Sequence, residues 1–328
     1  MRAFGTFSGL LVIAVVSALL ALKLGAVNLQ WSHLFSAFTG EDAGVFEQII
    51  WQLRAPRVAV AFLAGGGLAL AGAMLQTVTR NPLADPYLFG ISAGAGLGVV
   101  IAMTLLGVTS GFALSASAFS GAMVATAILL AVVVSLRYMQ TAVMVLCGVA
   151  LSFGFSACTS LLLYFSDPQA VSAVVFWTLG SFSRAELAMV LPLFALLIGV
   201  LVIVMLLRKQ LNALLLGDES AHTLGVNVKA LRIVVLVLSA LITAVLVSIC
   251  GGIGFVGLMV PHLVRLSGRF DNSQLYPMSF IFGGIFMIWV DLIARLALQN
   301  QELPIGVITA TIGSLFFFAL LYHQYRRD

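Results

Sequence analysis

The sequence contains very few charged residues. Asp, Glu, Lys and Arg together make up 9% of the 328 residues, whereas 62% of the residues are hydrophobic. A soluble domain needs more polar side chains to cover its surface, so this composition argues against a soluble protein with an oversized core. The formal net charge is +4. Because the basic residues are few and lie at the ends of apolar runs, this charge indicates membrane topology rather than nucleic-acid binding.

Sequence motifs for metal binding and for disulfide bonding are also missing. The three cysteines, Cys147, Cys158 and Cys250, lie inside apolar stretches, and no CxxC pair occurs. The four histidines lie far apart in the sequence, so a metal site built from them is not expected. We expect this chain to bind no cofactor and no metal, and to have no catalytic residues, since neither a Ser-His-Asp set nor a carboxylate pair is recognisable.

The sequence has no phosphate-binding loop of the form GxxxxGK[ST]. None of the three lysines, Lys23, Lys209 and Lys229, is followed by Ser or Thr. If ATP drives this protein, a separate partner subunit must therefore bind ATP and Mg²⁺. ATPase activity of this chain itself is not expected.

Acidic residues are scarce inside the apolar runs. Asp291 is the clear exception, and Arg295 follows it at the spacing of an i,i+4 ion pair on one helix. A carrier driven by protons or sodium more often holds unpaired acids at mid-membrane, so this scarcity argues against ion-coupled secondary transport. Such a transporter remains the alternative from another class.

Long apolar runs are what the sequence has in abundance. Since about 20 helical residues cross the hydrocarbon core, they predict an all-α integral membrane protein with one domain, 1–328. The ten candidate spans are approximately 7–27, 58–79, 88–108, 112–136, 141–165, 187–207, 231–250, 253–267, 276–298 and 304–322. The first is longer than a signal-peptide core and is interpreted as a retained helix. The apolar stretch 168–182 is too short to cross, which indicates a re-entrant or surface helix.

Charges between the spans predict the orientation. If the N-terminus is cytoplasmic, the inner side carries more basic residues than the outer side, as the positive-inside rule requires, and both termini are cytoplasmic. The inner basic residues are then Arg2, Arg80, Arg137, Arg208, Lys209, Lys229, Arg232, Arg265, Arg269, Arg326 and Arg327. The outer charged residues are Arg54, Arg57, Arg184 and Arg295, with Lys23 near the boundary, and the acids Glu41, Asp42, Glu47, Asp167, Glu186 and Glu302.

The predicted inner loop 208–231 is unusually apolar for a segment in water. Gly217 and Gly225 bracket a short amphipathic helix, and apolar residues that include Ala221 and Leu224 are expected to cover one face of it. We interpret this loop as a docking element for a partner. A solvated loop lying on the lipid surface is the alternative.

Small residues recur at helical spacing on two of the spans. Such stripes let helix backbones pack closely, and they also suit an uncharged, weakly polar pathway wall; the sequence leaves both interpretations open. The stripes consist of Gly148, Ser152, Ser156 and Ser160 on the fifth span, and of Gly306, Thr309, Ala310 and Gly313 on the tenth.

Five motifs spread over the chain carry a resemblance to a known family. They are Gln52-Leu53-Arg54-Ala55-Pro56-Arg57, Gly72-Ala73-Met74-Leu75-Gln76, Asn81-Pro82-Leu83-Ala84-Asp85-Pro86, Gly254-Phe255-Val256-Gly257-Leu258-Met259-Val260-Pro261-His262 and Glu302-Leu303-Pro304-Ile305-Gly306-Val307. In this order they resemble the FecCD permeases, the membrane subunits of bacterial ABC importers for ferric siderophores, haem and vitamin B12. The resemblance covers nearly the whole chain and fits the ten predicted spans.

The resemblance implies a homodimeric type II ABC importer permease in the bacterial inner membrane. Its pathway would run along the axis shared by two copies, lined by the fifth and tenth spans. A periplasmic substrate-binding protein would dock on the outside, and two ATP-binding cassette subunits on the inside. The implied cargo is an iron chelate, either a ferric siderophore or haem, with vitamin B12 as the alternative.

The resemblance also implies roles for individual residues. The binding-protein docking residues would be Arg54, Arg57 and Arg295. The residues that couple to the ATPase would be Gly217, Asp218, Glu219, Ala221, Leu224 and Gly225. The cytoplasmic gate would map onto Asn81, Leu83, Thr141 and Ala142. A vitamin B12 member of the family has a small polar residue where Ala142 stands here, which slightly weakens a vitamin B12 assignment.

Overall fold

The computed structural model describes most of the chain, namely residues 2–25, 27, 29–40, 44–108, 111–135, 141–268, 270–299 and 301–325. Within these residues the fold is helical, and the β-type pairing consists of one isolated bridge between Leu298 and Gln301. Several charges used for the predicted orientation lie outside the described residues: Arg137, Arg269, Arg326, Arg327, Glu41 and Asp42.

The helices follow one another with short connections. In chain order they are α1 Arg2–Lys23, α2 Trp31–Thr39, α3 Val45–Gln48, the π-helical segment η1 Ile49–Arg54, α4 Ala55–Thr79, the 3₁₀ turn η2 Pro86–Phe89, α5 Ile91–Leu105, α6 Gly111–Ser135, α7 Thr141–Tyr164, α8 Pro168–Thr178, α9 Leu187–Leu206, α10 Arg208–Leu215, α11 Asp218–Thr223, α12 Val228–Cys250, α13 Val256–Ser267, α14 Asn272–Leu296 and α15 Ile305–Tyr325.

Among the described residues, seven helices are long and apolar enough to cross a membrane. Three shorter apolar helices, Phe7–Lys23, Ile91–Leu105 and Val256–Ser267, complete the set. Seven and three together correspond one to one to the ten predicted spans. The predicted short helix after the fifth span is also present, as α8.

The second span is longer than its apolar run predicts. The helix is continuous from Val45 to Thr79, so much of the expected outer loop 28–57 is helical. Pro56 cannot donate a backbone hydrogen bond, and in a sequence it indicates a helix start. Here the π-helical segment η1 ends two residues before Pro56, and the helix continues through the proline without interruption.

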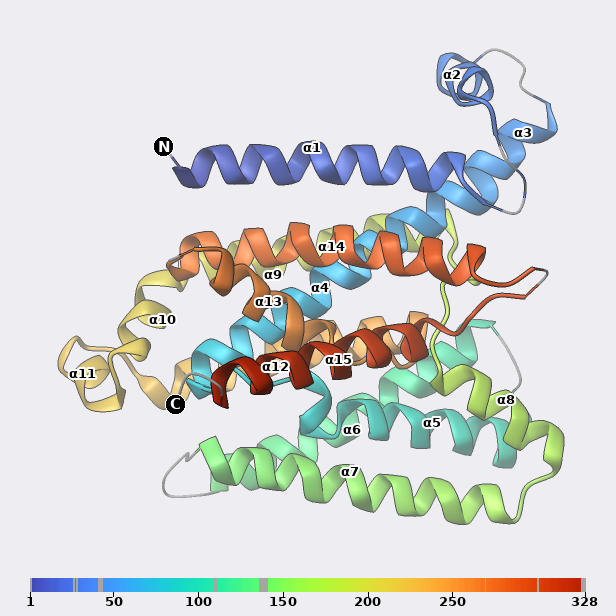
Figure 1. Ribbon diagram of the computed structural model, residues 1–328. Coiled ribbons are helices and arrows are strands. Elements are labelled where there is room, and N and C mark those ends of the chain that lie inside the picture. Colours follow the sequence, from blue (N-terminus) through green and yellow to red (C-terminus); the bar gives the residue numbers. More distant parts are fainter. Residues whose placement is uncertain are drawn as a thin grey trace.

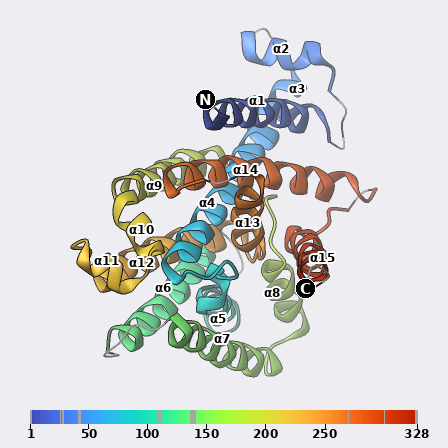
Figure 2. The same ribbon diagram turned by 60° about the vertical axis from the view of Figure 1, so that its left-hand side comes forward.

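Helix α4 is the centre of the bundle. It is buried along almost its entire length and packs against α14, α12, α13 and α9. Figure 1 shows α4 running obliquely between α14 and α12, with α1 forming the outermost layer beside α14. Helices α5, α6 and α7 form a second group, and Figure 2 shows it on the far side of α4 from α1.

Glycines allow α4 to approach its neighbours backbone to backbone. A Cβ atom built on Gly72 would lie 1.8 Å from the carbonyl oxygen of Gly257 in α13, and one on Gly65 would lie 2.1 Å from that of Gly283 in α14. Neither site can hold a larger residue unless the helices separate. At the first crossing, the Gln76 side-chain amide donates to the carbonyls of Gly257 and Leu258, both at 3.2 Å.

The two ends of the bundle differ. Helices α10 and α11 lie at the same end as both chain termini, which we call the α11 end (Figure 1). Helices α2 and α8 lie at the opposite end, which we call the α8 end. The functional residues predicted from the sequence gather mainly at these two ends.

The α4–α13 crossing gives a stability prediction. Gly72→Ala should lower stability by about 1–3 kcal/mol, because the added methyl group overpacks the helix contact. Gly96→Ala on α5 is the matched control, since a Cβ there would meet no atom within 4 Å. The thermal unfolding midpoint in detergent is the measurement. Equal unfolding midpoints for the two variants would show that α4 and α13 can move apart at this contact without loss of stability.

Candidate functional site

An ion cluster lies at the α8 end and joins α4 to α14. Arg57 donates from Nε to Asp291 Oδ1 at 2.8 Å, and its two terminal nitrogens lie 2.7 and 3.0 Å from the carboxylate of Glu302. Asp291 also pairs with Arg295, with 3.0 Å between Nε and Oδ2, so the predicted i,i+4 ion pair is present. The side chain of Asp291 is buried, whereas that of Glu302 is 46% exposed.

The three arginines predicted to dock a binding protein differ in their surroundings. Arg54 is buried and donates to the backbone carbonyls of Leu22 and Lys23, at 2.7 and 2.8 Å, and to that of Val27. Arg295 also donates to carbonyls at the end of α1, at 3.4 Å. These two side chains therefore fasten α1 to the bundle. Of the three, Arg57 is the one whose ion pair reaches an exposed acid.

The segment that carries α10 and α11 divides its apolar residues between the core and the surface. Ala221 is fully buried inside the chain, which corrects the expectation that it belongs to the docking face, and Leu214 of α10 is buried as well. The exposed apolar side chains are Leu215, Leu216 and Leu224. A bulky residue at position 221 would disturb the chain's own core.

Asp218, at the start of α11, binds two arginines. Arg80 is distant from it in sequence, and Arg232 is buried. The Oδ1 atom of Asp218 is 3.0 Å from Arg80 Nη2 and 3.0 Å from Arg232 Nη2. Arg232 belongs to α12 and is 4% exposed. Arg80 ends α4 in the left-handed conformation, with φ of 50°. Sequence reasoning missed this cluster, because nothing in the sequence pairs residues 80 and 218.

The predicted gate residues begin immediately after Arg80. Asn81 Oδ1 accepts a hydrogen bond from the backbone N–H of Leu83 at 2.9 Å, which fixes the turn, and the Leu83 side chain is exposed. Asp85 caps η2 by accepting from the backbone N–H of Tyr87 at 2.7 Å. The other two predicted gate residues, Thr141 and Ala142, stand in the first turn of α7.

Part of the predicted pathway lining is packed inside the chain instead. A Cβ on Gly148 would lie 2.3 Å from the Leu88 carbonyl oxygen, and one on Gly313 would lie 2.5 Å from Phe255. Thr309 is 1% exposed. Gly306 donates its N–H to Leu179 O at 2.9 Å, in the turn that follows α8. For these four residues, close packing is the correct interpretation of the small-residue stripe.

The rest of the two stripes lies nearer to the surface. Ser156 and Ser160 are exposed on α7, while Ser152 and Ala310 are half-buried. Among the described residues, helix α7 is the least buried of the seven long spans, and it packs mainly on α5, α6 and η2. Its open face therefore combines hydroxyl groups with apolar side chains such as Phe153.

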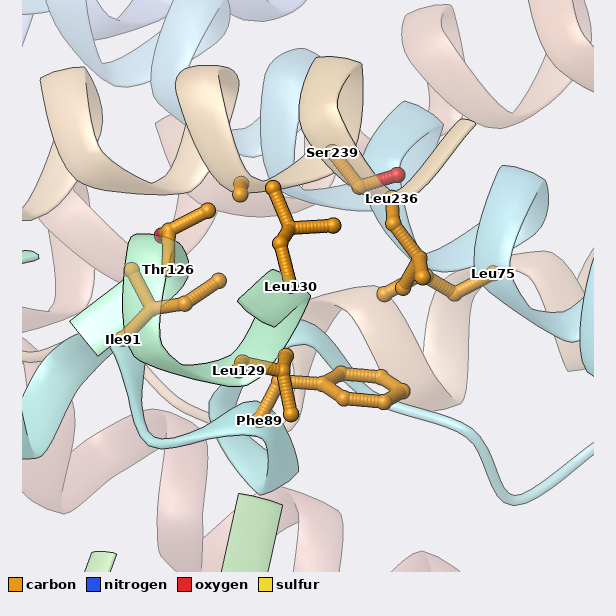
Figure 3. Close-up of a pocket in the computed structure, with 9 residues that line it drawn as sticks. Leu75, Phe89, Ile91, Thr126, Leu129, Leu130, Leu236 and Ser239 are labelled. Atoms are coloured by element: carbon orange, nitrogen blue, oxygen red, sulfur yellow. The ribbon is translucent and has the colours of Figure 1, made fainter. Parts of the chain in front are cut away.

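One enclosed cavity lies between α4, η2, α6 and α12 (Figure 3). Its volume is about 10 Å³, close to the space of a single water molecule, and mostly apolar side chains line it. Figure 3 shows Leu75, Phe89 and Leu130 converging on this space. It is far too small to hold a transported chelate.

Known proteins match this chain over almost its whole length. The model of the FecCD transport family matches residues 11–323. The "Putative ABC transporter permease protein MJ0087" of Methanocaldococcus jannaschii is 34% identical, covering 97% of this chain and 94% of that protein. The "Vitamin B12 import system permease protein BtuC" of Klebsiella pneumoniae is 39% identical, covering 95% of this chain and 92% of that protein.

A solved structure has the same fold. Its title is "An inward-facing conformation of a putative metal-chelate type ABC transporter", and it aligns with a TM-score of 0.87 and 33% identity. The alignment covers 97% of this chain and 99% of that one. The helical bundle, its apolar spans and the family match over residues 11–323 agree. The chain therefore belongs to the FecCD transport family and is an integral membrane ABC importer permease.

Proposed function

We propose that this permease imports a bulky metal chelate into the cytoplasm, driven by ATP hydrolysis in a separate subunit. The family match over residues 11–323 is the observation that carries the proposal. An iron chelate, either a ferric siderophore or haem, is the first candidate cargo. Vitamin B12 is the second, and it is favoured by relatives that bear the name of vitamin B12 permeases at 38–39% identity.

The proposed assembly is a homodimer in the inner membrane with two ATP-binding cassette subunits and a periplasmic binding protein. The α11 end would face the cytoplasm, and its described basic residues Arg80, Arg208 and Lys209 support this orientation. The open face of α7 would then line the pathway, with Ser152, Ser156 and Ser160 on it and Ala310 contributed by α15. Such a surface offers hydroxyl groups and apolar contact, which suits passage of a cargo rather than its retention.

Docking of the binding protein would centre on Arg57. A planar guanidinium group binds a carboxylate through two parallel hydrogen bonds, and Glu302 now occupies that fork. A carboxylate of the partner must therefore displace Glu302 or share Arg57 with it. Arg54 and Arg295 would act by holding the end of α1 beside this position.

Coupling to the ATPase would use the exposed leucines that flank α11, together with Asp218. Leu216 and Leu224 would enter a groove on the ATPase. Asp218 lies on α11 itself and binds Arg80, which directly precedes the gate residue Asn81. A movement of α11 would thus be transmitted from the Asp218 carboxylate to Arg80 and from there to the adjoining gate residue.

Cargo and energy source can be tested by uptake into vesicles. The permease is reconstituted with the ATPase and binding protein of its own transporter, and labelled ferric siderophore, haem and cobalamin are supplied. We expect ATP-dependent accumulation of an iron chelate. Accumulation of cobalamin alone would select the second candidate, and uptake that follows a proton or sodium gradient without ATP would contradict the proposed function.

The docking proposal predicts opposite effects for the two members of the exposed pair. Glu302→Gln should tighten binding of the periplasmic protein by a factor of about 1.4 to 5, because the competing ion pair is worth about 0.2–1 kcal/mol. Arg57→Lys should weaken binding, since lysine cannot make the two parallel hydrogen bonds that a guanidinium group makes to a carboxylate. Glu186→Gln, another exposed acid at the same end, is the control. Binding to the nanodisc-embedded transporter is measured, and an affinity unaffected by Glu302→Gln argues against competition.

The coupling proposal predicts a looser gate when Asp218 loses its charge. With a nitroxide label on Leu83→Cys in a background free of native cysteines, Asp218→Asn should increase label mobility and reduce ATP-driven uptake several-fold. Asp218→Glu should restore part of both. Asp271→Asn removes an exposed acid that bonds Ser273 at the start of α14 and serves as the charge-matched control. Unchanged mobility in Asp218→Asn would rule out this link.

A further inference from the structure

The short helix α2 has three distinct faces. Leu34 and Ala37 form the buried face and pack with Leu22 of α1, Ile50 of η1 and Val58 of α4. This face holds α2 firmly on the bundle. A capping box between Gln30 and His33 fixes its first turn, and Gly40 ends it in the left-handed conformation.

A second face carries large aromatic side chains that the described residues leave well exposed, although Trp51 meets Phe38 edge to face. Trp31, Phe35 and Phe38 are 44%, 68% and 53% exposed. They stand at positions i, i+4 and i+7, so they form one stripe along the helix. A third face, which carries Ser32 and Thr39, is exposed and polar. Exposing three adjacent aromatic rings to water is unfavourable, so this face indicates contact with a less polar surface.

The position of α2 identifies what meets the aromatic stripe. Figures 1 and 2 both show α2 beside α1, on the side away from the rest of the bundle. The adjoining helix α1 exposes Leu11, Val12 and Val15, which in a membrane-spanning helix face lipid. The aromatic stripe therefore continues the lipid-facing surface of α1, at the end where that apolar helix stops.

A cation marks the same boundary. The ammonium group of Lys23, the last residue of α1, lies 4.7 Å from the centre of the Trp31 ring. Lysine and tryptophan side chains concentrate where hydrocarbon gives way to headgroups, because each has an apolar part and a polar end. Figure 1 shows α2 nearly end-on while α1 runs in the plane of the picture, so α2 does not run along the span.

We propose that α2 is an interfacial helix that inserts the stripe of Trp31, Phe35 and Phe38 into the headgroup region of the bilayer. Its hydroxyl face, with Ser32 and Thr39, points to water. The occupant of the stripe is thus a lipid surface and not a protein partner. This inference uses the membrane location of the chain and does not depend on the cargo or on the ATPase.

The test compares two labelled positions on the same helix. An environment-sensitive fluorophore is attached to Phe35→Cys or to the control Ser32→Cys, in the full chain with C147A, C158A and C250A, reconstituted in phosphatidylcholine vesicles. Nitroxide lipids labelled near the headgroup should quench the label at position 35 several-fold more than at position 32. Aqueous iodide should quench position 32 more strongly.

A measurement with native cysteines guards against a misfolded background. Vesicles of brominated phosphatidylcholine should quench tryptophan fluorescence of the wild-type chain more than that of Trp31→Phe. Equal lipid quenching at positions 35 and 32, or no change in bromolipid quenching on loss of Trp31, would overturn the proposal. Iodide access at position 35 that disappears when the rest of the transporter is added would show that a protein covers the stripe.

Discussion

Lipid gives helices no hydrophobic reason to associate, since lipid tails are as apolar as leucine, so this bundle depends on how closely its backbones approach. Helix α4 satisfies that condition on two sides, through Gly72 against α13 and Gly65 against α14. The same contacts leave room for Gln76 to bond the carbonyls of the neighbouring helix. Helices α14, α12, α13 and α9 all pack directly on α4.

The charges of the protein are arranged around the same helix. Arg57 stands in its first turns and Arg80 is the residue that ends it, so each ion cluster includes a residue of α4 or of its cap. In both clusters one group is buried and one is exposed: Asp291 and Glu302 at one end, Arg232 and Asp218 at the other. The buried member fixes the position of the arginine or the carboxylate, and the exposed member brings the cluster to the surface.

Much of the architecture follows from the sequence, because apolar run length and i,i+4 spacing are local properties. The ten spans and the pair of Asp291 with Arg295 needed only such local information. Contacts between residues distant in sequence do not follow from such local information, as the pairing of Arg80 with Asp218 and of Arg57 with Glu302 shows. A stripe of small residues also does not show what packs against it. Gly148 packs against the turn before α5, whereas Ser156 on the same helix is exposed.

The long helix from Val45 to Thr79 has a consequence for the response of the protein to its membrane. Its 35 residues, at about 1.5 Å each, extend over about 52 Å, whereas the hydrocarbon core is about 30 Å thick. The oblique course of α4 in Figure 1 is one way to fit such a length. A thicker bilayer would draw this helix more upright and a thinner one would lean it further. Because Arg57 and Arg80 sit near the two ends of α4, bilayer thickness would act on both ends of the permease through a single tilt.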